Sequence, residues 1–150
     1  MTIEYHVNRA TEIQIEKHLK LCEANFKPPL SERVELQGYS KKIADKAVRF
    51  EAWEENVLIA LIASYCNDNE NRSAFITSVS VLKEMQGKGL AKKLMKQCIK
   101  HIKALGLEQV ILEVGNENAN AIAFYGKHNF MVSRIEDKTS FMKLNLLKGI

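Results

Sequence analysis

The segment Val79-Ser80-Val81-Leu82-Lys83-Glu84-Met85-Gln86-Gly87-Lys88-Gly89-Leu90-Ala91 holds the strongest structural signal in the sequence. An apolar stretch ends at Val81, a loop with two glycines follows, and a helical pattern begins at Leu90. A helix that starts directly after such a loop presents unpaired backbone N–H groups and the positive end of its dipole. Gly87 and Gly89 allow the backbone to curl closely around a ligand. The segment therefore predicts a cradle for an anion.

This cradle differs from two common nucleotide-binding motifs. GxGxxG needs a glycine at position 92, which is Lys92, and a Walker loop needs GxxxxGK followed by Ser or Thr, which is absent. Neither a Rossmann nor a P-loop interpretation fits. For this segment taken alone, a plain glycine turn between a strand and a helix stays open as the alternative.

Apolar periodicity extends the assignment outward from the loop to one mixed α/β domain, residues 1–150. Strands are expected at 3–7, 48–52, 57–65, 74–81, 110–114, 130–135 and 139–146. Helices are expected at 11–26, 41–47, 90–105 and 119–128, with a short helix or turn at 30–38. Pro28-Pro29 are expected to end the first of these helices. We interpret 110–114 as a parallel strand buried on both faces, in a βαβ unit after an antiparallel meander.

Length and composition exclude several classes of protein. The chain has 150 residues, of which 46% are hydrophobic and 27% charged, as in an ordinary globular domain. No apolar run approaches the roughly 20 residues that span a bilayer, and the N-terminus lacks the apolar core of a signal peptide. We therefore expect a cytoplasmic protein without a membrane partner.

Cysteines and histidines give no sign of metal chemistry. Cys22, Cys66 and Cys98 lie far apart without a CxxC pair, and the four histidines are equally scattered. We expect reduced, mostly buried cysteines and no metal site.

Two motifs at a fixed separation carry a family resemblance. Gln86-Gly87-Lys88-Gly89-Leu90-Ala91 fits (Gln/Arg)-x-x-Gly-x-(Gly/Ala) and resembles the acetyl-CoA loop of the GNAT superfamily of N-acetyltransferases. Leu112-Glu113-Val114, followed by Asn118-Ala119-Asn120-Ala121-Ile122-Ala123-Phe124-Tyr125-Gly126-Lys127-His128-Asn129-Phe130, looks like the family's "LxV…N..AiafYeklGF" segment. Asn129 replaces the usual glycine, which is tolerable because Asn enters left-handed conformations more easily than most residues.

The resemblance covers residues 74–130 well, and the order of elements extends it over the chain. It implies the GNAT-type acyl-CoA N-acyltransferase fold, a central twisted sheet of about seven strands flanked by about four helices. It also implies acetyl-CoA as cosubstrate, without a metal.

The resemblance further assigns the residues that bind the cofactor. The strand ending at Val79-Ser80-Val81 would splay from its neighbour through a bulge and pair its backbone with pantetheine, and the loop N–H groups would hold the pyrophosphate. Lys88, Lys92 and Lys93 would meet phosphates, a solvated helix face being the alternative for each. Asn118 would touch the cofactor and cap the next helix. The expected binding residues are Val79, Ser80, Val81, Gln86, Gly87, Lys88, Gly89, Leu90, Ala91, Lys92, Asn118, Asn120 and Tyr125.

The same resemblance makes Tyr125 the general acid that protonates the departing thiolate. A phenol suits this role because its pKa, near 10, keeps its proton at neutral pH. A packed aromatic ring beside Phe124 is the structural alternative. The general base is open: Thr77 and Ser78 stand where many relatives place a Glu, Glu113 is a candidate that could equally make a structural hydrogen bond, and a water chain is a third option.

The predicted function is acetyl transfer from acetyl-CoA to a primary amine by direct attack in a ternary complex. The acceptor would be a small molecule selected by residues 26–47, with Pro28-Pro29 and Tyr39, and by Trp53 and Tyr65. A weak resemblance favours amino sugars, and a polyamine, an antibiotic or a protein or peptide amine stays open. A coenzyme A sensor without turnover is the non-enzyme alternative.

The distribution of charge along the chain indicates which kind of partner the protein binds. Seven lysines and one acid, Glu84, lie between Lys83 and Lys103, a local excess of +6 in a chain of net charge +4. We expect this patch to meet a polyphosphate cofactor and not a nucleic acid, because no exposed aromatics are interleaved with the lysines. The strand at 139–146, which ends in Leu146-Leu147, could pair across a homodimer interface.

Overall fold

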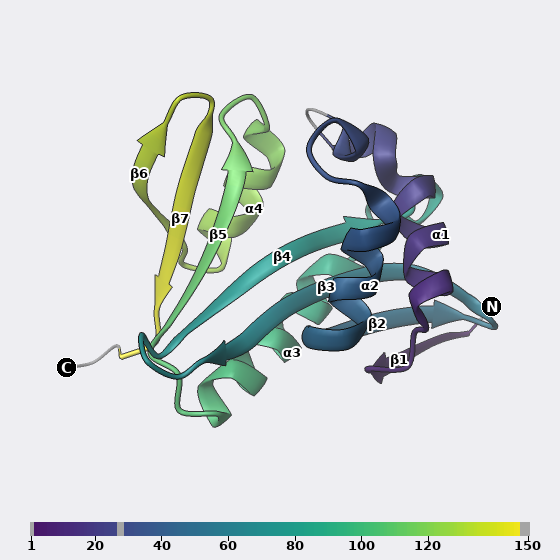
Figure 1. Ribbon diagram of the computed structural model, residues 1–150, viewed down its shortest axis with the longest axis horizontal. Coiled ribbons are helices and arrows are strands. Elements are labelled where there is room, and N and C mark those ends of the chain that lie inside the picture. Colours follow the sequence, from purple (N-terminus) through teal and green to yellow (C-terminus); the bar gives the residue numbers. More distant parts are fainter. Residues whose placement is uncertain (1, 27–28, 148–150) are drawn as a thin grey trace.

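One mixed sheet of seven strands forms the centre of the protein, in the order β1-β2-β3-β4-β5-β7-β6 (Figure 1). The computed structural model describes residues 2–26 and 29–147. The strands are β1 (Ile3–Val7), β2 (Val48–Glu54), β3 (Val57–Asp68), β4 (Ser73–Val81), β5 (Gln109–Gly115), β6 (Met131–Glu136) and β7 (Thr139–Asn145). Every neighbouring pair is antiparallel except β4 and β5. The predicted mixed α/β sheet is confirmed.

Four α-helices cover the sheet. They are α1 (Glu12–Cys22), α2 (Leu36–Lys46), α3 (Leu90–Ala104) and α4 (Ala119–Lys127), and short 3₁₀ turns occupy Glu23–Asn25, Leu30–Glu32 and Lys83–Met85. Helices α1 and α2 lie on one face of the sheet, and α3 and α4 lie on the other (Figure 1). Within the described residues, no helix is long and apolar enough to cross a membrane.

The boundaries of α1 and α2 differ from the prediction. The capping box of α1 is present: Thr11 Oγ1 accepts from the Gln14 N–H, and Gln14 Oε1 accepts from the Thr11 N–H. The helix nevertheless ends at Cys22 and passes into a 3₁₀ turn, so its predicted extension to residue 26 is wrong. Pro28, the expected stop, lies outside the described residues.

Helix α2 begins at Leu36, earlier than the predicted start at residue 41. The Glu35 carboxylate caps it by accepting from the backbone N–H groups of Gln37 and Gly38. Sequence patterns miss this start because Glu is not among the favoured N-cap residues and Gly38 weakens the helical signal of the first turn.

Strand β5 is buried on one face only, which corrects the expectation of burial on both. Val110, Leu112 and Val114 are buried, whereas Glu113 between them is exposed. The reason is that β5 pairs in parallel with β4 only near its start and runs antiparallel to β7 along its whole length. Alternation between a covered and an open face is typical of antiparallel strands.

Strand β7 cannot pair across a homodimer interface, which corrects a second expectation. It lies between β5 and β6 and forms a ladder with each of them. Both of its edges are therefore occupied, and the outer strands of the sheet are β1 and β6.

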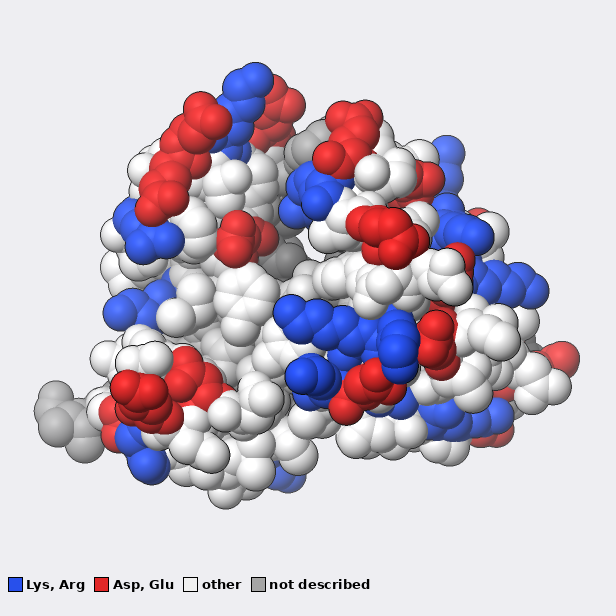
Figure 2. Space-filling model, in the orientation of Figure 1, with Lys and Arg blue, Asp and Glu red and all other residues white. Residues whose placement is uncertain are grey.

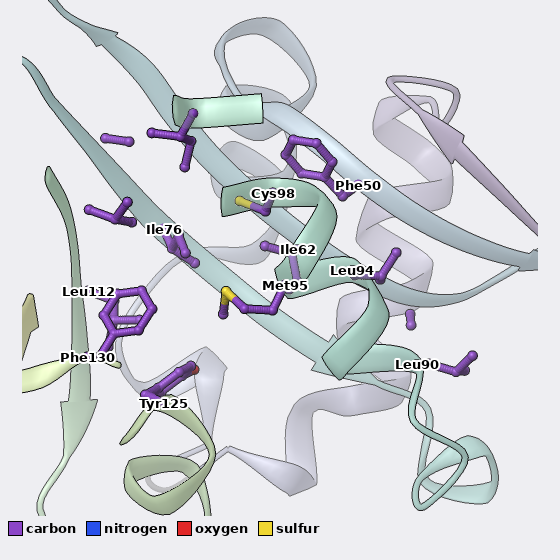
Figure 3. Close-up of a cluster of buried hydrophobic side chains, with 14 of the residues drawn as sticks. Phe50, Ile62, Ile76, Leu90, Leu94, Met95, Cys98, Leu112, Tyr125 and Phe130 are labelled. Atoms are coloured by element: carbon purple, nitrogen blue, oxygen red, sulfur yellow. The ribbon is translucent and has the colours of Figure 1, made fainter. Parts of the chain in front are cut away.

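Two clusters of buried side chains hold the layers together. The larger joins α3, α4 and one face of the sheet; Figure 3 shows Leu94, Met95 and Cys98 of α3 packed toward the strands, with Tyr125 and Phe130 at one edge. The smaller joins α1 and α2 to the opposite face.

A buried carboxylate anchors the smaller cluster. Glu51, which is fully buried, accepts hydrogen bonds from the backbone N–H groups of Arg9 and Ala10 and from Trp53 Nε1. Its Oε2 lies 3.6 Å from Arg49 Nε, and such multiple donors are what allow a charge to be buried. The site fixes the start of α1 against β2.

Candidate active site

A cleft opens where β4 and β5 separate. The two strands pair only between Ser73–Phe75 and Gln109–Ile111, yet β4 continues to Val81 and β5 to Gly115 (Figure 1). The resulting cleft has a volume of about 350 Å³. Figure 2 shows it as a hollow between two lobes, with acidic and basic side chains on the rims. It is lined by residues 76–81 of β4, residues 112–115 of β5, and residues from the start of α3 and from both ends of α4.

A bulge in β4 lies at the point of separation. Ala63 of β3 pairs with Ser78, whereas Ser64 pairs with Ile76, so Thr77 is an extra residue in β4. A bulge of this kind bends its strand and increases the local twist. The bulge expected from the family resemblance is therefore present, at Thr77.

Helix α2 supports this bulge through a buried phenol. Tyr39 Oη donates to the Thr77 carbonyl oxygen at 2.7 Å and lies 2.8 Å from Thr77 Oγ1. Burial raises the pKa of Tyr39 to about 12, although the hydrogen bond to Thr77 opposes this shift. The phenol therefore keeps its proton and serves as a hydrogen-bond donor to the bulge.

The loop at the open end of β4 has the geometry of an anion cradle. Gly87 and Gly89 have φ angles of 83° and 77°, in the left-handed region, and a Cβ atom on either would meet nothing within 4 Å. The first backbone hydrogen bond of α3 runs from the Lys93 N–H to the Gly89 carbonyl. The N–H groups of residues 87–92 have no partner among the described residues and are free to bind an anion. Gln86 Nε2 ties the loop to β4 by donating to the Val81 carbonyl.

The lysines after this loop do not form a single patch at the cleft, which corrects the charge prediction. Lys93 Nζ lies 3.9 Å above the Tyr5 ring, on the side of β1. The charges of Lys92 and Lys96 reach His128 at the end of α4, where burial and these two lysines lower the pKa of the imidazole. Lys96, Lys100 and Lys103 line a second hollow away from the cleft. Lysines that are close in the sequence lie on different sides of the helix.

Tyr125 of α4 reaches the cleft from the edge of the larger core. The residue is 9% exposed, and its ring makes edge contacts with Phe124 and Phe130 at centroid distances of 5.5 and 5.9 Å. Figure 3 shows Tyr125 beside Phe130. Burial raises the pKa of its phenol to about 12. Its hydroxyl has no hydrogen-bond partner in the described part of the chain, so it is a free proton donor at the cleft.

Asn118 and Asn120 stand at the start of α4 and border the cleft. Asn118 is the N-cap, as expected: its Oδ1 accepts from the Ala121 N–H at 3.2 Å. This bond uses the side-chain oxygen and leaves the amide NH₂ for a ligand. Asn120 is exposed.

Glu113 is the acidic side chain that lines the cleft. Leu112 and Val114 belong to the core on the α3 and α4 face, so Glu113 projects to the opposite face, the side of α1 and α2. Within residues 2–26 and 29–147, its carboxylate has no hydrogen-bond or ion-pair partner. The structural hydrogen bond considered for it is therefore not made.

Three further residues line the cleft that no sequence motif indicated: Cys22, Phe26 and Arg33. Phe26 and Arg33 fall in the stretch 26–47 expected to select the acceptor, but nothing in their local sequence singles them out. They border the cleft because α1 and α2 bring their connection to its mouth, on the side to which Glu113 projects.

Trp53 cannot contact an acceptor, which corrects that prediction. Its ring is fully buried in the smaller cluster, and the Arg9 guanidinium lies 4.4 Å above it. Tyr65 does not line the cleft, and its hydroxyl is buried without a hydrogen-bond partner. The aromatic character of a strand residue does not reveal which face it occupies.

The buried His18 of α1 forms hydrogen bonds to β3 and to β4. His18 Nδ1 donates to the Leu58 carbonyl at 2.9 Å, so Nε2 is the nitrogen that accepts from Ser80 Oγ, also at 2.9 Å. Cys22 Sγ lies 3.6 Å from the same Nε2. Burial lowers the pKa of His18 to about 4, against these two hydrogen bonds, so the imidazole is neutral at neutral pH. The Ser80 side chain, expected only as part of a binding strand, thus positions α1 on β4.

Comparison with known families agrees with this architecture. The family described as "Acetyltransferase (GNAT) family" matches residues 13–130. The chain therefore belongs to the GNAT family of acetyltransferases. Among the described residues, no three His, Cys, Asp or Glu side chains gather in a way that could hold a metal ion.

Individual relatives share parts of the sequence. A protein of Bacillus subtilis subsp. natto described as "Probable spermine N(1)-acetyltransferase" is 31% identical over 74 residues, which are 49% of this chain and 49% of that protein. The chain spans about half or less of the length of the curated relatives that it matches.

Solved structures share the fold over nearly the whole chain. The PaiA N-acetyltransferase of Thermoplasma acidophilum, in complex with coenzyme A, has a TM-score of 0.74 at 16% identity and covers 97% of this chain and 99% of its own. The yncA protein of Salmonella typhimurium, with its cofactor acetyl-CoA, has a TM-score of 0.75 at 16% identity and covers 99% of this chain and 96% of its own.

Proposed function

We propose that this protein transfers an acetyl group from acetyl-CoA to a primary amine of a small molecule. The observation that carries the proposal is the cleft between β4 and β5, which joins a cradle of free N–H groups at one end to the Tyr125 hydroxyl and the Glu113 carboxylate. No element of the described chain uses these groups for folding. They are available for a ligand that is anionic at one end and reactive at the other.

This geometry supports the proposed cofactor-binding residues. The exposed edge of β4 beyond the bulge offers backbone groups to a pantetheine amide, and the N–H groups of residues 87–92 suit a pyrophosphate. Lys88 and Lys92 add positive charge beside the loop, and Asn118 offers its amide NH₂. The proposed set is Val79, Ser80, Val81, Gln86, Gly87, Lys88, Gly89, Leu90, Ala91, Lys92, Asn118, Asn120 and Tyr125.

Tyr125 and Glu113 have distinct roles in the proposed reaction. Acetyl-CoA supplies the acetyl group as a thioester. Tyr125 holds its proton at the phenol oxygen over the whole neutral range and gives it to the leaving thiolate. Glu113 accepts a proton from the attacking amine, directly or through water, and its negative charge attracts the amine in its ammonium form.

The acceptor is a small amine that also carries polar or anionic groups. Glu113 and Arg33 border the cleft from the same face and supply opposite charges. Arg33 has no ion-pair partner in the described part of the chain. An amino sugar offers an amine and several oxygen atoms to this pair, whereas a polyamine presents only positive charge to Arg33. The relative described as a spermine acetyltransferase makes a polyamine the competing acceptor class.

A turnover assay tests the proposal. The purified protein is incubated with acetyl-CoA and glucosamine, spermine, an amino acid or a peptide with a free N-terminus, and free thiol is measured. We expect thiol release above the amine-free rate, highest with the amino sugar.

Two results would overturn parts of this proposal. If no amine raises the rate while coenzyme A still raises the melting temperature, the protein binds the cofactor without turnover. If spermine or the peptide is the best acceptor, the enzyme assignment stands and the acceptor class is replaced.

A further inference from the structure

The sheet has an open face on β5, β7 and β6, on the side away from α3 and α4. Leu112 of β5 points into the larger core, so the next residue, Glu113, points to the opposite face. The ladders continue this face outward, because Glu113 pairs with Phe141 of β7, and Phe141 pairs with Arg134 of β6. Residues that pair directly across two strands share a face. We call this surface the open face.

Helices α1 and α2 do not cover the open face, although they lie on the same side of the sheet. Among the described residues, the smaller cluster beneath them takes its strand residues from β2 and β3 and none from β5, β6 or β7. Figure 1 shows α1 and α2 over the other half of the sheet, with β5, β7 and β6 uncovered on that side. The open face therefore borders the space through which an acceptor reaches Glu113.

The open face carries two positive charges near Glu113. Lys143 lies two positions after Phe141 on β7 and is a diagonal neighbour of Glu113, with Cβ atoms about 7 Å apart. Arg134 lies over the Phe141 ring at 4.0 Å, and its Nε is 2.9 Å from Glu136 Oε2. Lys143 is exposed and forms no ion pair with any described residue. Its positive charge is therefore the one on this face that is available to a ligand.

Arg33 supplies a positive charge from the opposite wall. It follows the 3₁₀ turn at Leu30–Glu32, and among the described residues it and Glu113 are the only charged side chains that line the cleft. Burial raises the pKa of Tyr39 to about 12, and the positive charge of Arg33 is one of the effects that oppose this rise, so the guanidinium lies near the phenol that supports the bulge. Within the described part of the chain, Arg33 and Glu113 form no ion pair. The opening therefore holds one carboxylate with an unpaired cation on either side.

This arrangement of charges distinguishes between classes of acceptor. A simple amine would place its ammonium group at Glu113 and leave both cations without a counter-charge. A polyamine would bring further positive charge beside Arg33 and Lys143, which is repulsive. An amine that also carries a phosphate or a carboxylate would pair with the cations through charge-assisted hydrogen bonds. Charge complementarity therefore favours an acceptor with groups of both signs.

We propose that the acceptor is an anionic amine, whose amino group reaches Glu113 and whose phosphate or carboxylate is held by Arg33 and Lys143. These two residues determine specificity and do not touch the reacting atoms. The inference rests on the proposed function, because it concerns the acceptor of the same site. It narrows that acceptor to molecules with a full negative charge and excludes polyamines.

Pairs of amines that differ in one anionic group test the proposal. Glucosamine 6-phosphate is compared with glucosamine, β-alanine is compared with β-alaninamide, and spermine is the polycation. Thiol release at saturating acetyl-CoA gives kcat/KM for each amine. Calorimetric binding of the same amines to the coenzyme A complex is measured in parallel, because it needs no turnover and keeps the cofactor cradle filled. We expect the anionic member of at least one pair to be preferred about tenfold, and the pair that responds identifies the anion as phosphate or carboxylate.

Charge-reversal variants assign the preference to these residues. The double variant Arg33→Glu/Lys143→Glu should lower kcat/KM for the preferred anionic amine about tenfold and raise it for spermine about threefold. A loss of folded protein cannot produce changes in opposite directions. The matched variant Lys100→Glu/Lys103→Glu makes the same charge change on α3, on the other side of the sheet, and should alter both values less than about twofold.

The outcomes separate this inference from the proposed function. The inference is overturned if neither anionic amine binds better than its neutral partner, or if both double variants change the preference equally. Faster turnover with spermine than with either anionic amine would also overturn it and leave acetyl transfer standing. If no amine is acetylated, yet glucosamine 6-phosphate binds the coenzyme A complex through Arg33 and Lys143, the proposed function falls and the inference about the ligand stands.

Discussion

Tyr125 combines two properties that a general acid needs, a free hydroxyl at the cleft and a proton that it retains at neutral pH. Tyr125→Phe removes the hydroxyl and keeps the edge contacts of the ring with Phe124 and Phe130. We expect kcat to fall by about 10²-fold with little change in the affinity for coenzyme A.

The measurement is steady-state thiol release together with calorimetric binding of coenzyme A. Tyr5→Phe, on β1 and outside the cleft, is the matched control. An unchanged kcat in Tyr125→Phe contradicts the general-acid assignment and leaves the residue as a packed aromatic.

Glu113 is the residue whose role the sequence leaves most open. Its carboxylate borders the cleft without a partner in the described chain, so Glu113→Gln should cost little stability because no native contact is lost. Because Glu113 is the proposed proton acceptor, Glu113→Gln should lower kcat/KM for the amine by about 10²-fold, while coenzyme A binding persists.

Thr77→Val provides the comparison, because it removes a side-chain hydroxyl from another residue that lines the cleft. If Thr77→Val lowers kcat/KM for the amine and Glu113→Gln does not, the proton leaves through hydroxyl groups and not through the carboxylate.

The bulge in β4 depends on a contact from outside its own sheet. Tyr39 Oη satisfies the Thr77 carbonyl, which the bulge leaves out of the ladder between β3 and β4. Tyr39→Phe removes the partner of this part-buried carbonyl, which costs about 1 kcal/mol in the free energy of unfolding.

Tyr65→Phe is the matched control, because the Tyr65 hydroxyl is already buried without a partner. Its removal should leave the free energy of unfolding unchanged or raise it slightly. Urea unfolding of both variants measures the difference, and equal losses would show that the bond to Thr77 contributes nothing specific.

Elements set by nearby residues could be predicted from the sequence. The capping box of Thr11 and Gln14, the left-handed Gly87 and Gly89, and the N-cap Asn118 all depend on interactions within a few residues. Asn129, expected to tolerate a left-handed conformation, has a φ of 73°.

Contacts between segments that are distant in the sequence could not be predicted from such local patterns. Tyr39 and Thr77 are 38 positions apart, and His18 and Ser80 are 62 apart. No periodicity links such pairs, so the support of the bulge and the anchoring of α1 could not be foreseen. The burial of Trp53 was missed because alternation in β2 identifies two faces without saying which helices cover them.

The stability of the whole molecule depends on pH through the buried His18. The folded state holds its pKa at about 4, below the value of 6.5 for an unperturbed histidine, because the imidazole is buried. Protons therefore bind the unfolded chain more tightly. The contribution of neutral His18 is fully present above about pH 6.5 and is lost as the pH falls through 4, a change of about 3 kcal/mol.

We expect the free energy of unfolding to fall more steeply between pH 6.5 and 4 in the natural protein than in His18→Gln, which cannot take up a proton. Urea denaturation across this range measures both slopes. His6→Gln, at a half-exposed position, is the control. Parallel slopes for the natural protein and His18→Gln would contradict the assignment.

The short junction between β4 and β5 has a consequence for how the folded chain opens. In the described residues, the three pairs between Ser73–Phe75 and Gln109–Ile111 form the only strand ladder that connects β1–β4 to β5–β7. Amide hydrogen exchange should therefore divide the protein into two cooperative units that open with different free energies. A ligand whose own amides bond to the free edge of β4 and whose other end is held by α4 would act as a staple between the units, and exchange in both should then slow together.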